Sequence, residues 1–491
     1  MDLERVKREV FSLISPQTPG LAVGVYADGA AVLTVAQGAA CVEFGVPVDE
    51  HTRFDIASAS KQFTAACVLL LERDGKVGLD DDVRMHVPEL NLEVPVTLRQ
   101  CLQHTGGLPE WYGLQALTGV PLAEMTEERL LEVLAGIRRT TFEPGTAFAY
   151  SNTGYVLAAV VVNRVTNMSL ARFARERLFE PLGMADSVFR DDASVPLERL
   201  AYGYANAGGE EPRRADTQES AVGDGGLVTS VADLAPWFGF LADGRVLGAD
   251  LRDRLLERGV LADGTVQPYA LGIYHGDDWF GHAGGMHGYL SNLLYLPDPG
   301  VGIAVLSNQT AIDPVRLSHR LVRLLLGTAE PPKPAPATSA PPERLHWHDP
   351  AGDGTLTLEP ADGRLVIAGV GAFTAGADGR WHGTGDAEGA WLEIDGDRMF
   401  LRVGPPARPP VVFHAASPPS DAPMPDGVFH SRELDIAATV RDGQVHFGRE
   451  LKLPVTPAPG GAWEAGLFTL RLHEGDLLVS GGGLRRMRFD G

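Results

Sequence analysis

Hydrophobic residues recur at helical spacing at the start of the chain and alternate with polar residues directly afterwards. Residues 2–14 carry an apolar stripe, which predicts an amphipathic helix. Residues 20–38 contain two β-branched runs on either side of the turn-forming sequence ADGA, and this pattern predicts a β-hairpin. The stripe of the predicted helix consists of Leu3, Val6, Val10 and Leu13.

Helix and strand patterns then divide the first two thirds of the chain. Helical spacing dominates from about residue 58 to residue 250. Three strand patterns return in 270–276 and 289–309, and a further helix is predicted over 314–327. We expect the two early and three late strands to form one antiparallel sheet, covered by helices and interrupted by a helical insertion. The sequence therefore predicts an α/β fold for this part.

The last third of the chain has a different pattern, which begins after a proline-rich segment. Short alternating strands joined by Asp-Gly turns predict an all-β region of small antiparallel barrels. A second proline cluster at 416–427 divides this region. We predict an α/β domain over 1–328, a linker over 329–343 and β-barrels over 344–415 and 424–491. Whether the two barrels form one unit is left open.

Composition and charge exclude several classes of function. The 491 residues carry a net charge of −22, which argues against nucleic acid or an anionic membrane as a partner. No apolar stretch is long enough to cross a bilayer, and the charged start lacks a secretory apolar core, so a cytoplasmic protein is predicted. Cys41, Cys67 and Cys101 match neither a disulfide framework nor a zinc motif. With no nucleotide motif either, no cofactor or metal is predicted, and the oligomeric state is left open.

Lysine is scarce in this chain, and one lysine follows a serine by three residues at the start of an apolar run. Ser58 and Lys61 would share one helix face, so the amine could reach the hydroxyl. Burial and the helix dipole are expected to lower the pKa of Lys61, so that a neutral amine takes the proton of Ser58. Arginine could not do this, because guanidinium stays charged. The alternative is an N-cap serine followed by an unrelated lysine. The lysines are Lys7, Lys61, Lys76, Lys333 and Lys452.

Two further segments contain candidate chemistry. Tyr150 and Asn152 lie in a loop before a predicted helix, where a tyrosine can relay a proton and an amide can hold a carbonyl group. A core tyrosine with an asparagine cap is the alternative. His282 and Gly284 precede a predicted strand, and the glycine would let a substrate backbone approach closely. A glycine-rich turn with an incidental histidine is the alternative there.

The three candidate segments, around Ser58, Tyr150 and His282, occur in an order and a sequence context that resemble those of a known protein family. Residues 6 to 327, approximately, resemble the penicillin-binding-protein and class C β-lactamase family of active-site-serine enzymes. The flanking sequences LQHTGGLP, FEPLGM and GDGGLVTSVADL are also similar to this family. The three family motifs correspond to Ser58-Ala59-Ser60-Lys61, Tyr150-Ser151-Asn152 and His282-Ala283-Gly284.

The resemblance implies a β-lactamase/transpeptidase-like fold and a role for each matching residue. Ser58 would be the nucleophile that forms an acyl-enzyme, and Lys61 would be its base. Tyr150 would carry a proton to the leaving group, and Asn152 would bind the substrate amide. The backbone N–H groups of Ser58 and Gly285 would form the oxyanion hole, with Gly284 beside them.

His282 stands where the family usually has a lysine that binds the substrate carboxylate. Histidine is a weaker cation whose charge depends on pH, which disfavours β-lactam hydrolysis. The H-x-G motif is similar to the branch of D-aminopeptidases, certain esterases and penicillin-binding-protein-type thioesterases, some of which carry C-terminal, lipocalin-like barrels that border the active site. Trp111 and His287 are further candidates for the substrate pocket, whereas His104 is interpreted as a loop or core histidine.

The resemblance implies an enzyme that transfers acyl groups from a peptide amide, ester or thioester. A D-stereospecific peptidase, amidase or esterase would hand the acyl group to water. The alternative is a cyclase that hands it to the substrate's own N-terminus and receives its peptide from a carrier protein. A β-lactamase or a DD-carboxypeptidase is less favoured. A non-catalytic scaffold is disfavoured because Ser58, Lys61, Tyr150 and Asn152 are all present.

Overall fold

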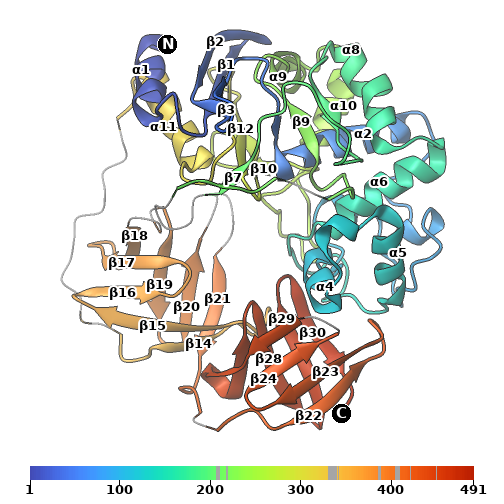
Figure 1. Cartoon of the computed structure of the whole chain (residues 1–491), viewed down its shortest axis with the longest axis vertical. Coiled ribbons are helices and arrows are strands. Elements are labelled where there is room, and N and C mark those ends of the chain that lie inside the picture. The colour runs from blue at the N-terminus through green and yellow to red at the C-terminus, as the bar shows by residue number, and fades with distance from the viewer. Residues whose placement is uncertain are drawn as a thin grey trace. The chain divides into compact units, whose positions relative to one another are not determined.

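A computed structural model of the chain shows two compact units. The first comprises Met1–Leu108, Leu122–Leu131 and Phe142–Glu330, and the second comprises Pro109–Pro121, Glu132–Thr141 and Pro331–Gly491. Figure 1 shows the elements of each unit. The structure describes residues 1–205, 211–216, 219–329, 340, 342–384, 387, 389–403, 410–420, 422–448 and 451–491.

The first unit is built on one six-stranded sheet whose strands come from both ends of the unit. Its strand order is β10-β11-β12-β13-β1-β2, and every neighbouring pair is antiparallel. Leu21 of β1 pairs with Ser307 of β13, so the predicted pairing of early and late strands is confirmed. One strand, β11, was not predicted. The bounds are β1 (Leu21–Ala27), β2 (Ala30–Gln37), β10 (Tyr274–His275), β11 (Phe280–Met286), β12 (Tyr289–Leu296) and β13 (Val301–Ser307).

Two terminal helices, α1 (Leu3–Leu13) and α11 (Pro314–Leu326), cover one face of this sheet (Figure 1). Both helices bury a stripe of aliphatic residues against the sheet, which removes apolar surface from water. The predicted stripe of α1 is wrong at its end, because Leu13 is 41% exposed. Residues shared by this core include Val6, Val10, Val23, Val25, Leu317, Leu321 and Leu325.

The other face of the sheet is joined to the buried helix α2 (Lys61–Arg73) through aromatic rings. Tyr26 of β1 stacks on Phe238 of α9 (Leu234–Asp243) at 4.6 Å between ring centroids. Trp237 of α9 stacks on Phe63 of α2 at 4.1 Å. The other helices of this insertion are α3 (Leu98–Leu102), α6 (Thr153–Thr166), α7 (Leu170–Ala174), α8 (Glu180–Leu182) and α10 (Ala249–Leu255), with α5 (Glu127–Gly136) at the unit boundary.

The second unit contains a closed antiparallel barrel of eight strands, which confirms the predicted all-β character of the C-terminal region. The barrel runs from β14 to β21 and closes where Trp347 pairs with Ala415. Trp347, Leu358 and Phe373 are completely buried in its interior. The strands are β14 (His346–His348), β15 (Thr355–Ala361), β16 (Arg364–Ile367), β17 (Gly371–Ala375), β18 (Trp381–Thr384), β19 (Trp391–Asp395), β20 (Arg398–Arg402) and β21 (Val411–Ala415).

Two further sheets follow this barrel, one of four strands and one of five. An isolated bridge between His430 and Asp490 brings their outer strands together. The second barrel over 424–491 and the domain boundaries stay predictions, and the linker 329–343 lies largely outside the described residues. The strands are β22 (Gly427–Ser431), β23 (Ile436–Arg441), β24 (Gln444–Phe447), β25 (Leu451–Pro454), β26 (Thr456–Ala458), β27 (Ala462–Ala465), β28 (Phe468–His473), β29 (Asp476–Gly481) and β30 (Leu484–Phe489).

Helix α4 (Trp111–Thr118) belongs to the second unit although its sequence lies far from the C-terminal strands. A Cβ atom on Gly113 would lie 2.4 Å from the carbonyl oxygen of Gly482, so glycine is needed for this close packing. The N–H of Glu110 donates to the carbonyl of Gly483 at 3.3 Å. The sequence pattern did not predict this association. Among the helices of the described residues, none combines the length and apolar character needed to cross a membrane.

Candidate active site

Ser58 lies in a tight turn between a short strand and the buried helix α2. The chain leaves β5 (Phe54–Asp55) and forms the 3₁₀ helix η1 (Ala57–Ser60), so Ser58 precedes α2 rather than lying on it. The N–H of Ala57 donates to the Asp55 carboxylate at 2.8 Å, and Ala57 has a left-handed φ of 47°. This conformation is uncommon for a residue with a side chain and shows that the turn is held firmly.

Lys61, the first residue of α2, joins three separate segments at its amine. Its side chain is completely buried. Lys61 Nζ donates to Asn152 Oδ1 at 2.6 Å and to the carbonyl oxygen of Asp224 at 2.6 Å, and it lies 3.1 Å from Ser58 Oγ. Asn152 is the N-cap of α6, as its predicted position before a helix required. Asp224 was not predicted to take part, because its backbone carbonyl accepts from the lysine and a backbone contact leaves no signal in the sequence.

The backbone around Asp224 is fixed to the first turn of α2. Thr64 Oγ1 donates to the carbonyl of Gly223 at 2.7 Å, and the N–H of Leu227 donates to Ser60 Oγ at 3.1 Å. A Cβ atom on Gly223 would lie 2.6 Å from the carbonyl oxygen of Tyr155 in α6. The missing side chain therefore lets this segment lie close enough for its Asp224 carbonyl to reach Lys61.

Tyr150 lies beside this amine, as the sequence predicted. Lys61 Nζ is 5.0 Å from the centroid of the Tyr150 ring. The Tyr150 hydroxyl is buried and has no hydrogen-bond partner among the described residues. Burial, followed by the neighbouring Tyr274, raises the pKa of Tyr150 well above its ordinary value, while Ser58 lowers it in part. The phenol is therefore neutral at physiological pH and can donate a proton.

His282, on β11, is a neutral histidine and not the pH-dependent cation expected from the sequence. It is 4% exposed. Nδ1 lies 2.5 Å from the carbonyl of Ala283 and must donate to it, so Nε2 accepts from the Tyr269 hydroxyl at 3.0 Å. Burial, and then the charge of Lys61, lowers the pKa of His282 to about 3. The enclosed site excludes the water that would stabilise imidazolium.

Gly284 allows close packing inside the protein itself. A Cβ atom on Gly284 would lie 2.0 Å from the carbonyl oxygen of Ile56 and 2.7 Å from Ser291 Oγ. The glycine thus admits the protein's own backbone next to the Ser58 turn, and its predicted role toward a substrate stays a prediction. Gly285 is exposed, and a Cβ atom built on it would lie 3.1 Å from Leu290 Cδ2. Its N–H remains the predicted second donor of an oxyanion hole.

His104 is a residue of this site whose importance the sequence interpretation missed. It is 2% exposed and contacts the chain on both sides of Tyr150. The N–H of Ala149 donates to the His104 carbonyl at 3.0 Å, and the N–H of Ser151 donates to His104 Nδ1 at 3.2 Å. The centroids of the His104 and Tyr150 rings lie 4.2 Å apart. Burial, followed by Lys61 and His282, lowers the pKa of His104 well below its ordinary value, so Nδ1 stays an acceptor.

Trp111 and His287 are the remaining residues that were predicted for the substrate pocket. Trp111 is completely buried in the second unit and stacks on Tyr112 at 3.8 Å. His287 is exposed, and its Nε2 lies 3.0 Å from Glu219 Oε1, which raises the pKa of His287. Their roles at the substrate stay predictions. No three His, Cys, Asp or Glu residues of the described ranges are grouped to hold a metal ion.

A helix-flanked antiparallel sheet with a serine and a buried lysine at a helix start is the arrangement of active-site-serine hydrolases. The profile of the beta-lactamase family matches residues 5–328. This chain therefore belongs to the beta-lactamase family and is a serine hydrolase.

Known proteins similar to this chain include peptidases and penicillin-binding-protein relatives. A D-aminopeptidase of Cereibacter sphaeroides is 29% identical over 480 residues, which cover 93% of this chain and 89% of that protein. The octameric penicillin-binding protein homologue from Pyrococcus abyssi shares the fold over 100% of both chains, with a TM-score of 0.59 and 20% identity. A D-stereospecific amidohydrolase from Streptomyces sp. shares it over 67% of this chain and 100% of that chain, with a TM-score of 0.55 and 22% identity.

We predict that His104 positions Tyr150 through its Nδ1 acceptor. His104→Leu removes the acceptor and should lower kcat about tenfold or more, with a smaller change in KM. His104→Asn keeps an acceptor and tolerates the left-handed φ of 58° at this position, so it should retain kcat within about threefold. Steady-state kinetics on folded variants measure both effects. Equal losses in the two variants would contradict the assignment.

A second prediction concerns acid stability. The pKa of His282 is about 3 in the folded chain and has its ordinary value in the unfolded chain. At pH values between these two pKa values, the unfolded chain binds a proton on His282 and the folded chain does not. Stability should therefore fall as the pH drops through this window. In His282→Gln, the loss of unfolding free energy between pH 7.5 and pH 4.5 should be smaller by about 2 kcal/mol. Denaturant titrations measure this, and the exposed control His446→Gln should match wild type.

Proposed function

We propose that this chain is a D-stereospecific aminopeptidase or amidase that forms an acyl-enzyme on Ser58. The observation that carries the proposal is the contact between the buried amine of Lys61 and Ser58 Oγ. The likeness to D-aminopeptidases, which extends over nearly the whole chain, supports a substrate with a D-residue. Peptides and amides are the substrate class that this likeness favours.

The contacts of Lys61 support its role as the base. The oxygens of Asn152 and Asp224 can only accept hydrogen bonds, and each lies 2.6 Å from Nζ. A neutral amine has two N–H donors, which these two oxygens occupy. Its lone pair then points to the remaining partner, the Ser58 hydroxyl, which can donate as well as accept. Two carbonyl acceptors therefore orient the amine so that it can take the proton of Ser58.

The reaction can then be written with each proton accounted for. Ser58 Oγ attacks the substrate carbonyl carbon as its proton passes to Lys61. The backbone N–H groups of Ser58 and Gly285 stabilise the oxyanion. Tyr150 donates its phenolic proton to the leaving amine as the C–N bond breaks, and Lys61 returns a proton to Tyr150. Water then attacks the acyl-enzyme ester and gives its proton to the pair of Tyr150 and Lys61, and this proton passes to Ser58 Oγ as the ester C–O bond breaks.

In this proposal, Asn152 binds the substrate carbonyl group. Asn152 Oδ1 is occupied by Lys61, so its amide NH₂ is the group that can donate to a substrate carbonyl.

No contact in the site favours an amine over water as acceptor. Macrocyclisation and a carrier protein are therefore not proposed. Ester and thioester cleavage would follow the same steps with a better leaving group.

The test of the function is a comparison of stereoisomers. D-alanine p-nitroanilide should be hydrolysed with a kcat/KM roughly hundredfold above that of the L-isomer. Ser58→Ala should abolish the reaction, because no other nucleophile is positioned at the lysine. Faster cleavage of the L-isomer, or activity that survives in Ser58→Ala, would refute the proposal. A linear peptidyl ester that yields a product one water lighter than the free acid would indicate a cyclase instead.

Replacement of the base gives an independent test of the mechanism. Lys61→Arg keeps a positive charge but cannot lose its proton, so kcat should fall by about a thousandfold or more. The exposed Lys76→Arg is a matched control that should retain full activity. The rate of Ser58 labelling by a fluorophosphonate reports on the nucleophile without a leaving amine. Near-normal labelling of Lys61→Arg would show that Lys61 is not the base.

A further inference from the structure

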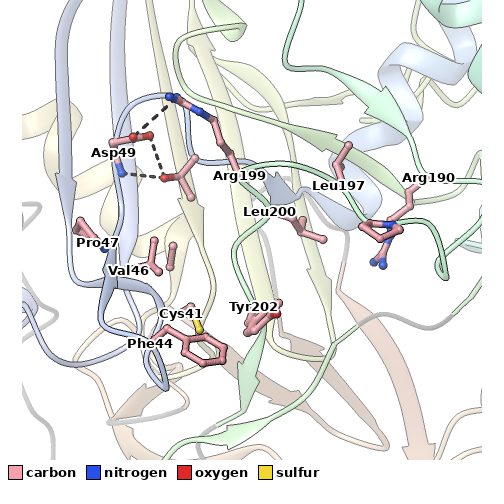
Figure 2. A pocket seen from close by; sticks show the side chains of 13 residues that line it. Cys41, Phe44, Val46, Pro47, Asp49, Arg190, Leu197, Arg199, Leu200 and Tyr202 are labelled. Carbon is pink, nitrogen blue, oxygen red and sulfur yellow. Dashed lines mark hydrogen bonds and ion pairs between the residues drawn. The ribbon is translucent and has the colours of Figure 1, made fainter.

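A cavity of about 400 Å³ lies in the first unit, and Figure 2 shows the side chains that line it. One wall is the hairpin of β3 (Ala39–Cys41) and β4 (Val46–Pro47). The other wall is the segment from Arg190 to Tyr202. Cavities of this size hold small organic ligands in other proteins. None of the residues predicted for catalysis lines it.

Apolar side chains form most of the cavity wall. Phe44 is 78% exposed and Val46 is 47% exposed, although both are large hydrophobic residues. Leu197 and Leu200 face them from the second wall (Figure 2). Exposed apolar side chains that converge on one concavity are typical of a binding site, because their burial by a ligand removes apolar surface from water.

The cavity is also positively charged, in contrast to the chain as a whole. Arg190 and Arg199 line it together with a single acidic residue, Asp49, which lies 3.8 Å from Arg199. The Nε atom of Arg190 is buried and has no hydrogen-bond partner among the described residues, whereas Nη2 of the same guanidinium donates to the carbonyl of Ala193. A buried donor without a partner is costly, and an anion would satisfy it. In a chain of net charge −22, this local excess of arginine favours a negatively charged ligand.

The two walls are fixed relative to each other by backbone hydrogen bonds. The N–H of Tyr202 donates to the carbonyl of Ala40 at 2.8 Å, and the N–H of Arg53 donates to the carbonyl of Arg199 at 2.8 Å. The N–H of Arg190 donates to the carbonyl of Gly226 at 2.8 Å. The cavity is therefore preformed, so a ligand does not have to order it.

We propose that this cavity binds a small monocarboxylate with an apolar body, as a site separate from the Ser58 site. The carboxylate accepts hydrogen bonds from Arg190, and the apolar body lies against Phe44, Val46 and Leu197. Arginine is suited to this task, because its planar guanidinium matches the geometry of a carboxylate. The proposal does not depend on the catalytic function proposed above.

Calorimetric titration of the full chain with 3-phenylpropionate tests the proposal. The carboxylate should bind about tenfold or more tightly than its neutral analogue, 3-phenylpropionamide. Arg190→Gln should weaken binding of the carboxylate about tenfold and leave the amide unchanged. Phe44→Ala, a change of an exposed side chain, should weaken both ligands. Ser58→Ala and the exposed control Arg8→Gln should bind like wild type.

Each alternative result would overturn the proposal. The proposal is wrong if the carboxylate does not bind detectably or if it binds no more tightly than the amide. It is also wrong if Arg190→Gln binds the carboxylate as wild type does. Loss of binding in Ser58→Ala would place the ligand in the Ser58 site. Tighter binding of an N-acetyl dipeptide that ends in phenylalanine would show a site for the end of a peptide instead of a free monocarboxylate.

Discussion

The burial of one amine, that of Lys61, is the constraint on which the rest of the catalytic unit depends. A buried lysine needs hydrogen-bond acceptors, because the loss of water is otherwise too costly. The three printed partners of the amine come from the Ser58 turn, the start of α6 and the backbone at Asp224; the last two supply the acceptors, and the three segments are far apart in sequence. The fold must therefore bring these segments together within hydrogen-bonding distance. The same contacts that satisfy the lysine also orient it toward Ser58.

Close backbone packing makes this convergence possible. Gly223 lies against α6 and Gly284 lies against Ile56, at distances that no side chain could occupy. The pairing of β1 with β13 joins the two ends of the unit, so that β11 lies next to the turn that holds Ser58. Because several elements pack together around Lys61, a change in any of them should alter the position of the Lys61 amine.

The sequence predicted contacts between the candidate reacting groups better than it predicted the residues that support them. Alternation and helical spacing predicted the sheet, α1 and the all-β region, and the spacing of Ser58 and Lys61 predicted their contact. Strand β11 was missed because its sequence FGHAGGM has no β-branched residue and few side chains to reveal alternation. His104 and Asp224 were missed because they act through contacts with residues distant in sequence or through the backbone. The membership of α4 in the second unit likewise depends on packing against distant strands.

The neutrality of the two buried histidines bears on which substrate end this site can accept. His104 and His282 both lie near Lys61, and its charge helps to keep them unprotonated. A lysine in place of His282 would add a second cation close to Lys61 and would attract a substrate carboxylate. A neutral imidazole exerts no such attraction and does not repel an ammonium group. The replacement of lysine by histidine is therefore consistent with the proposed aminopeptidase activity, because a substrate of that class has a free amino end.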